Sequence, residues 1–215
     1  MSFQLHNFFR SSTSTRLRAV LNLKGLDYDY IPYVLRKGET RSPEYLALNP
    51  QGLVPSLVRE DGTVMTQSLA IIEWLDEVHP EPTLLPADPD ARAKDRALAY
   101  MIACDIHPLN NLRVLQYLGS EFGADEEKQK TWFTHWVSIT LDAFEQTLAS
   151  AEQQARYCLS DTPGLADVCL YAQNWNNKRF GIPVENWPNI SRVFAELDTL
   201  PAFQNAAPPK QPDAA

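Results

Sequence analysis

The chain has 215 residues, of which 44% are hydrophobic and 21% are charged, and its formal net charge is −8 at pH 7. Such a chain can bury a core in one large or two small domains, so we expect no extensive disorder. The acidic balance argues against a nucleic-acid partner, because phosphate binding needs an excess of Lys and Arg. The sequence shows no signal-peptide pattern and no apolar run near the ~20 residues that span a bilayer, so we expect a cytoplasmic protein without a membrane segment.

The first eighty residues alternate between strand-like and helix-like patterns. Short apolar stretches predict strands, and Pro32 places the second of them at a sheet edge, because proline cannot donate a ladder hydrogen bond. Capping residues followed by apolar residues at helical spacing predict helices between the strands. The resulting order, β-α-β-α-β-β-α, is typical of a small α/β layer with mixed strand directions. We expect strands at 3–8, 28–35, 53–58 and 63–65, and helices at 11–24, 42–49 and 68–78.

The remainder of the chain has a helical pattern. Residues 80–89 contain four prolines, which indicates a linker between two domains. We therefore expect an α/β domain at 1–82 and an all-helical domain at 90–215, whose last eight residues, PPKQPDAA, form a loose tail. The helices are expected at 90–119, 125–150, 165–180 and 190–197.

The cysteine and histidine residues indicate neither a disulfide framework nor a metal site. Cys104, Cys158 and Cys169 are far apart and odd in number, so we expect reduced, buried thiols. The four histidines lack metal-ligand spacing, so we expect no metal. Residues 1–42 carry seven Lys and Arg against three Asp and Glu, a local charge of +4 that is either scatter or a field favouring a small anionic ligand.

Pro55 lies within an apolar run at 53–57, where its missing N–H removes a ladder hydrogen bond. One interpretation is an edge strand or a bulge. The other is a cis peptide bond that turns the Val54 backbone outward, to pair with an extended peptide-like ligand.

Two helix starts carry polar residues with a second possible role. Ser68 can simply cap its helix, or the free N–H groups there can bind a carboxylate that the Gln67 amide also reaches. In the cluster 11–14, capping needs only one hydroxyl, and the others could donate to a thiolate and hold it ionised.

The helical half offers weaker candidates. Pro108 must kink or break the predicted helix 90–119, and His107, Asn110 and Asn111 beside it either pack at the kink or line a cleft. Arg179 stands at a helix end, where a solvated cation is favourable without any ligand.

Taken in their order along the chain, these motifs resemble those of the glutathione transferase superfamily. The double-hydroxyl turn is similar to that of the zeta-like branch, which includes maleylacetoacetate and maleylpyruvate isomerases. The resemblance extends over nearly the whole chain and includes residues 211–213. It rests on Arg10–Ser14, Leu-Asn-Pro-Gln-Gly-Leu-Val-Pro at 48–55, Gln67–Glu73, residues 104–111, Thr162–Asp167 and residues 178–180.

The resemblance implies a thioredoxin-like first domain, an all-helical second domain, glutathione as cofactor and a homodimer. Val54 would pair with the glutathione backbone beside cis-Pro55, Gln67 and Ser68 would hold its γ-glutamyl end, and Thr40 would also contribute to binding. The sulfur would be surrounded by Ser11, Ser12 and Thr13 and approached by His107, Asn111 and Arg113. Arg10 and Arg179 match basic positions that can receive substrate carboxylates.

Two positions depart from the family pattern. Thr13 stands where the zeta motif commonly has cysteine; its hydroxyl can still donate to a thiolate, but redox chemistry of an enzyme cysteine is not expected there. Gly164 replaces a usual Ser or Thr helix cap, which should cost only about a few tenths of a kcal/mol.

We expect a glutathione-dependent cis–trans isomerase acting on a small anionic diacid, without nucleic-acid or membrane partners. The alternatives are a transferase or dehalogenase acting on α-halo acids, and a non-catalytic glutathione-binding module. Thr13 and the 107–111 run favour maleylpyruvate slightly over maleylacetoacetate.

Overall fold

The structure, a computed structural model, describes residues 3–150 and 154–214. It divides the chain into two compact units: the first comprises residues 1–84 with 198–215, and the second comprises residues 85–197. The expected helical domain at 90–215 therefore extended too far. The C-terminal segment groups with the first unit because α9 (Pro201–Ala206) packs against α1 (Ser12–Leu23), the first helix, a contact that a linear reading of the chain does not reveal.

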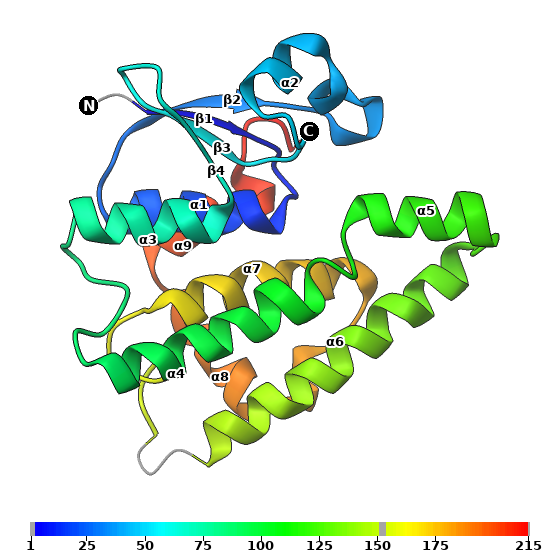
Figure 1. Cartoon of the computed structure of the whole chain (residues 1–215). Coiled ribbons are helices and arrows are strands. Elements are labelled where there is room, and N and C mark those ends of the chain that lie inside the picture. Colours follow the sequence, from blue (N-terminus) through cyan, green and yellow to red (C-terminus); the bar gives the residue numbers. More distant parts are fainter. Residues whose placement is uncertain (1–2, 151–153, 215) are drawn as a thin grey trace. The chain divides into compact units, whose positions relative to one another are not determined.

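A four-stranded mixed sheet lies at the centre of the first unit (Figure 1). Its strands are β1 (Phe3–Asn7), β2 (Tyr28–Pro32), β3 (Ser56–Val58) and β4 (Val64–Thr66). The order is β2-β1-β3-β4, in which β1 is parallel to β2 and antiparallel to β3, and β3 is antiparallel to β4. The predicted edge position of the second strand and the predicted element order are both confirmed.

Three predicted helices complete this layer: α1 (Ser12–Leu23), α2 (Pro43–Leu48) and α3 (Ser68–Val78). Two 3-10 turns, η1 (Leu35–Lys37) and η2 (Glu39–Arg41), precede α2. α1 and α3 lie side by side on one face of the sheet, and α2 lies on the other side (Figure 1). The apolar stripes that α1 and α3 turn to the sheet are buried, as a helix packed on a sheet requires. The core residues include Leu5, Leu17, Leu21, Leu57, Ile71 and Leu75.

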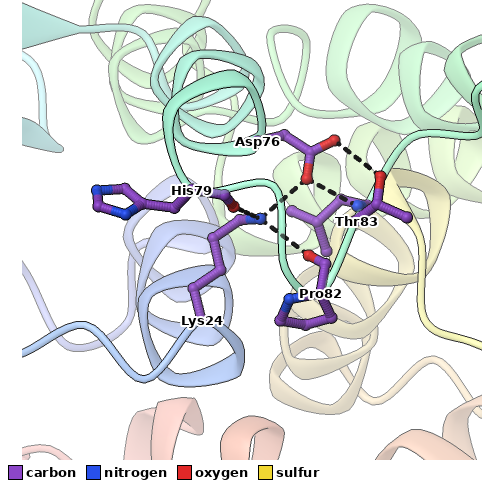
Figure 2. A network of polar contacts seen from close by, with 6 residues as sticks. Lys24, Asp76, His79, Pro82 and Thr83 are labelled. Atoms are coloured by element: carbon purple, nitrogen blue, oxygen red, sulfur yellow. Dashed lines mark hydrogen bonds and ion pairs between the residues drawn. The ribbon is translucent and has the colours of Figure 1, made fainter.

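A buried ion pair joins the end of α1 to the end of α3 (Figure 2). Lys24 Nζ lies 2.9 Å from Asp76 Oδ1 and donates to the carbonyl oxygens of His79 at 2.7 Å and Pro82 at 2.9 Å. The Lys24 side chain is 0% exposed, and that of Asp76 is 9% exposed. The Asp76 carboxylate also accepts the N–H of Leu84 at 2.8 Å. This set, called here the Lys24 cluster, fastens the segment after α3 to two helices and uses all three ammonium donors.

Residues 208–214 are folded, so the expectation of a loose tail was wrong for them, and residue 215 lies outside the described residues. Helix α9 (Pro201–Ala206) packs along α1, and the 3-10 turn η5 (Pro208–Lys210) follows. Gln211 is buried, and its amide donates to the carbonyl oxygens of Asn205 at 2.7 Å and Ala207 at 2.9 Å. A polar, proline-rich segment has little local structure of its own, and here contacts with residues far earlier in the chain order it.

The second unit consists of helices within the residues described. The predicted helix 90–119 is divided by a break at 107–111, because Pro108 lacks an N–H and its ring clashes with the preceding turn. The other predicted helices are confirmed. The elements are α4 (Pro89–Tyr100), the π-helical turn η3 (Met101–Ile106), α5 (Leu112–Phe122), α6 (Glu126–Ala149), α7 (Leu165–Phe180), the 3-10 turn η4 (Val184–Asn186) and α8 (Pro188–Leu197).

Two buried carboxylates lie at the start of α7. Asp167 accepts the N–H of Gly164 at 2.8 Å and that of Cys158 at 2.9 Å, so Gly164 serves as the cap residue, as predicted. Asp95 of α4 is 3% exposed and accepts the N–H of Ala166 at 3.4 Å, and its Oδ2 has no partner among the described residues. Burial and, secondarily, the Asp167 carboxylate raise the pKa of Asp95 to about 7.

Asp95→Asn should stabilise the protein at pH 8 but not at pH 4. In the unfolded chain Asp95 titrates near 3.8, so between that pH and about 7 the folded state keeps a proton that the unfolded state has lost. The contribution of Asp95 to the free energy of unfolding therefore falls as the pH rises from 3.8 to about 7. The expected gain at pH 8 is about 1–3 kcal/mol, the cost of a buried unsatisfied polar group.

Urea denaturation at both pH values, followed by tryptophan fluorescence, tests this expectation. Four of the five tryptophans lie in the second unit, so the signal reports mainly on the unit that contains Asp95. A gain of equal size at pH 4 and pH 8 would contradict the assignment.

No helix among the described residues is long and apolar enough to cross a membrane. No group of three or more His, Cys, Asp or Glu side chains in residues 3–150 and 154–214 could hold a metal ion. Cys158 and Cys169 are buried, as predicted, but Cys104 is exposed, because it lies with Asp105 on the outer side of η3.

Candidate active site

The N-terminus of α1 carries the first group of site residues. Ser11 is the cap: its Oγ accepts the N–H of Ser14 at 3.3 Å. The 12-residue helix directs its free N–H groups and the positive end of its dipole to this turn. One hydroxyl therefore serves as the cap, which leaves buried Ser12 and partly buried Thr13 for other contacts.

Two of these hydroxyls form a directed chain. Thr13 Oγ1 donates to the Val54 carbonyl oxygen at 2.9 Å and lies 2.8 Å from Ser11 Oγ. A hydroxyl has a single proton, so Thr13 cannot also donate to Ser11, and Ser11 must be the donor between them. A ligand anion can recruit the Ser11 proton without breaking the Thr13–Val54 bond. The geometry thus makes Ser11 the available donor and Thr13 its support.

The Thr13 contact connects this turn to the loop before β3. The Val54–Pro55 peptide bond is cis, and β3 begins at Ser56, so Pro55 precedes the strand and the predicted strand 53–58 is shorter than expected. Within the part of the chain that the structure describes, the N–H of Val54 has no hydrogen-bond partner. The Val54 N–H is thus a backbone donor that the fold does not use.

Side chains on α2 and at its end shape the same loop. Tyr45 Oη and Asn49 Nδ2 both donate to the Leu53 carbonyl oxygen, at 2.6 and 2.8 Å. Gly52 has φ +63°, and a Cβ there would lie 2.9 Å from the carbonyl oxygen of Thr40, so only glycine fits. Thr40 is 5% exposed, in η2. The loop geometry is therefore imposed by the first unit itself.

The start of α3 is a second helix N-terminus. Of the two interpretations of Ser68, simple capping was wrong: Gln67 occupies the cap position, without a side-chain cap bond, and Ser68 is the first helical residue. Gln67 has φ 68°, a left-handed conformation that costs a non-glycine residue about 1–3 kcal/mol and often marks a functional site.

Gln67 also contacts a residue that sequence reasoning missed. Its Nε2 donates to Gln51 Oε1 at 2.8 Å, and both side chains are exposed. Gln51 stands within the 48–55 run, but nothing in the local pattern distinguishes it from a turn residue. Two exposed amides beside an uncapped helix N-terminus offer donors for a carboxylate.

Arg10 is exposed and directly precedes the hydroxyl turn. Its guanidinium carbon lies 5.6 Å from the ring centroid of Phe8 and 5.0 Å from that of Phe9. Cation–π contacts of this kind restrict the side chain while leaving its N–H groups available to an anion.

In the second unit, three predicted residues lie around the break before α5. Asn111 caps α5, since its Oδ1 accepts the N–H of Arg113 at 3.2 Å, and its Nδ2 lies 3.5 Å from His107 Nε2. The Arg113 side chain is exposed. His107 and Asn111 are therefore neighbours, and Asn111 has a structural role besides any ligand contact.

Arg179 is exposed in the last turn of α7, with its guanidinium carbon 5.1 Å from the Phe180 ring centroid. Phe180 in turn stacks on Phe133, with centroids 3.7 Å apart. The position suits a cation at a helix C-terminus and also leaves an arginine at the surface of the unit.

A mixed thioredoxin-like sheet with flanking helices, followed by an all-helical unit, defines the glutathione transferase fold. Residues 10–78 match the family model described as the glutathione S-transferase N-terminal domain. A maleylacetoacetate isomerase from Pseudomonas aeruginosa is 46% identical, with 98% of each chain covered. The chain belongs to the glutathione transferase superfamily, in the zeta-class branch of maleylpyruvate and maleylacetoacetate isomerases.

Two solved structures are close to this one. The holo structure of a zeta-class maleylpyruvate isomerase has a TM-score of 0.96 and 48% identity, covering 99% of this chain and 100% of its own. A maleylacetoacetate isomerase from Methylobacterium extorquens, with bound malonate and glutathione, has a TM-score of 0.94 and 36% identity, covering 99% of both chains.

Proposed function

We propose that this chain uses glutathione to isomerise a small maleyl diacid, maleylpyruvate or maleylacetoacetate, to the fumaryl isomer in the catabolism of aromatic compounds. The observation that carries the proposal is the directed hydroxyl chain at the N-terminus of α1, which offers the Ser11 proton to an anion. The isomerases among its relatives, one of them with glutathione and a dicarboxylate bound, support the same activity.

Glutathione is held by the first unit in three places. The unused N–H of Val54 pairs with the peptide backbone, and Gln67, Ser68 and the N-terminus of α3 bind the γ-glutamyl end. The sulfur lies at the α1 turn, where Ser11 donates to it and buried Ser12 lines the turn. Thr13 supports Ser11 through their hydrogen bond. Thr40 shapes the loop around Gly52. The family resemblance supports a further contribution of His107, Asn111 and Arg113 to glutathione binding.

The chemistry requires an ionised thiol. A free thiol has a pKa near ~8.5, and lowering it by about two units needs ~2.7 kcal/mol of selective stabilisation of the anion. One charge-assisted hydrogen bond from Ser11 and the α1 dipole supply energy of this size.

The thiolate isomerises the substrate by adding to one carbon of the double bond. The π electrons move onto the conjugated carbonyl as an enolate, and the remaining single bond rotates. The enolate electrons then restore the double bond in the trans arrangement as the carbon–sulfur bond breaks and releases the thiolate. No net electron or atom is transferred, so glutathione is regenerated in each turnover.

The substrate's carboxylates require cationic partners. Arg10 and Arg179 serve this purpose, because an exposed guanidinium can pair bidentately with a carboxylate. The malonate bound by the Methylobacterium extorquens relative supports a dicarboxylate site in this family.

Arg179→Ala should reduce diacid turnover by about ten- to hundred-fold in kcat/KM, and glutathione binding by less than twofold. The arginine contacts the substrate's carboxylate and no part of glutathione. Steady-state kinetics with each substrate varied in turn separates the two effects. Lys178→Ala, which removes the neighbouring exposed cation of the same helix turn, is the matched control. Equal losses for both ligands would show that the substrate anchor lies elsewhere.

The proposed function is tested by following the absorbance of maleylpyruvate and of maleylacetoacetate with the purified protein, with and without glutathione. Glutathione-dependent conversion to the fumaryl product supports the isomerase, and the faster substrate identifies the pathway. Halide release from α-halo acids would instead indicate a dehalogenase. Glutathione binding without turnover of any of these compounds would indicate a non-catalytic module.

We also propose that the protein acts in the cytoplasm as a homodimer, which the family resemblance supports. Light scattering coupled to gel filtration, over a hundredfold range of protein concentration, measures the mass directly. A mass that remains near 24.3 kDa would exclude the dimer.

A further inference from the structure

The C-terminal segment 198–214 has a feature that the proposed function does not use. Its residue Asp213 is partly buried, and one carboxylate oxygen, Oδ2, accepts the N–H of Phe9 at 3.1 Å. The other oxygen, Oδ1, accepts the hydroxyl of Tyr30 on β2. A single carboxylate thus bridges an edge strand and the loop between β1 and α1, more than 180 residues earlier in the sequence.

Arg18 of α1 binds the same loop from the carbonyl side. Its Nη2 donates to the carbonyl oxygen of Phe9 at 2.9 Å, and its Nη1 donates to Asn7 Oδ1 at 2.8 Å. The same guanidinium donates to the carbonyl oxygen of Ala206 at 3.0 and 3.1 Å. Arg18 is 0% exposed, and although burial lowers its pKa to about 10, it remains charged at pH 7.

Both polar groups of Phe9 are therefore tied to the C-terminal segment: the N–H directly through Asp213, and the carbonyl oxygen through Arg18 and Ala206. A residue whose N–H and carbonyl oxygen are both hydrogen-bonded to charged side chains has little freedom to shift. The next two residues are Arg10, whose guanidinium rests on the Phe8 and Phe9 rings, and Ser11, the cap and available donor.

We propose that Asp213 is a positioning residue for the reaction: it holds Phe9 so that Ser11 meets the glutathione sulfur and Arg10 meets the substrate carboxylate. The inference rests on the proposed function for the roles of these two residues. Misplacing a reacting group by about 1 Å can cost as much as hundredfold in rate, so a carboxylate that never touches a ligand can still control turnover.

Asp213→Asn is the sharpest test, because asparagine keeps the shape but has one acceptor oxygen and no charge. Its single oxygen cannot stand at both carboxylate positions, so either its NH2 group faces the Phe9 N–H or the Tyr30 hydroxyl must turn to accept from that NH2 group. In either case the side chain no longer offsets the buried charge of Arg18. We expect kcat for the diacid to fall by about ten- to hundredfold. We also expect the pKa of bound glutathione, read from thiolate absorbance near 240 nm as pH is varied, to rise by at least about half a unit.

Tyr30→Phe is the matched control. It removes the other hydrogen bond to Asp213 and its share of stability, but leaves the Phe9 contact and the charge in place. It should lower the melting temperature while leaving the bound thiol pKa and kcat within twofold of wild type. If Asp213→Asn does not fold, Asp213→Glu, which displaces the carboxylate by one methylene, replaces it in the same comparison.

The proposal is overturned if the Asp213 variant leaves the thiol pKa and kcat unchanged in folded protein, or if Tyr30→Phe changes them equally. The two readouts also separate this inference from the proposed function. A wild-type protein that ionises bound glutathione but does not isomerise either diacid would refute the function, while the thiol titration would still decide the role of Asp213.

Discussion

Replacing Ser11 with alanine should lower glutathione-dependent isomerisation by about 10²–10³-fold, the cost of removing one preorganised donor to a developing or fixed anion. The bound thiol pKa should rise at the same time. The reason is the direction of the hydroxyl chain: the Thr13 proton is committed to the Val54 carbonyl oxygen, so Ser11 is the hydroxyl that can turn to the sulfur.

The same geometry predicts a smaller effect for Thr13→Val. This nearly isosteric change removes the support beneath Ser11 and the bond to the Val54 loop, but it frees the Ser11 proton for the thiolate. We expect a rise of about three- to tenfold in the KM for glutathione and little change in the thiol pKa. Comparable losses of kcat in the two variants would contradict the ranking of the hydroxyls.

Because Ser11 also caps α1, its loss should destabilise the protein by about 0.5–2 kcal/mol. Ser11→Asp separates the two roles. Aspartate is a good cap and should preserve stability, but its negative charge opposes a thiolate, so activity should fall as in the alanine variant. Thermal unfolding and the bound thiol titration, measured on both variants, distinguish the cap from the donor.

Lys24→Met should produce the largest loss of stability, about 3–5 kcal/mol, because it leaves the Asp76 carboxylate buried without its cation. Three acceptors lose their common donor in the same step, and residues 79–84 lose their attachment to α1 (Figure 2). For a protein whose total stability is about 5–15 kcal/mol, this loss is a large fraction. Urea denaturation followed by circular dichroism at pH 7 measures it.

Two controls define the cause. The double variant Lys24→Met with Asp76→Asn removes the unpaired charge and should recover part of the loss, giving a coupling energy between the two sites. Arg156→Met breaks the ion pair between Arg156 and Glu196, whose side chains are 53% and 39% exposed respectively. This change should have little effect on the free energy of unfolding. Similar losses from Lys24→Met and Arg156→Met would show that burial of the Lys24 cluster is not the source of its energy.

Local pattern was sufficient for most of the fold. Apolar spacing and caps indicated the seven elements of the first layer and their order, and Pro32 indicated the edge strand, since each of these signals acts within a few residues. The break of the helix at 107–111 was indicated by Pro108 alone. The family motifs then indicated the cis bond at Pro55, for which the local sequence left two interpretations.

Local pattern could not assign the polar contacts within the site. Capping of α3 was one of two interpretations of Ser68, but the backbone places Gln67 at the cap in a left-handed conformation. Gln51 contacts Gln67 from another loop. The sequence pattern does not distinguish the Ser11 hydroxyl from the Thr13 hydroxyl. The Val54 carbonyl oxygen, 41 residues away from Thr13, distinguishes them by accepting one proton.

The sequence by itself determined the class of fold, the two helix N-termini that we propose bind glutathione, and the family to which the chain belongs. The tertiary structure alone decided which hydroxyl is free to donate, and that residues 198–214 belong to the first unit and hold Phe9 through Asp213. The physical reason is range: periodicity and capping are properties of neighbouring residues, whereas a shared proton or a bridging carboxylate depends on groups brought together only by folding.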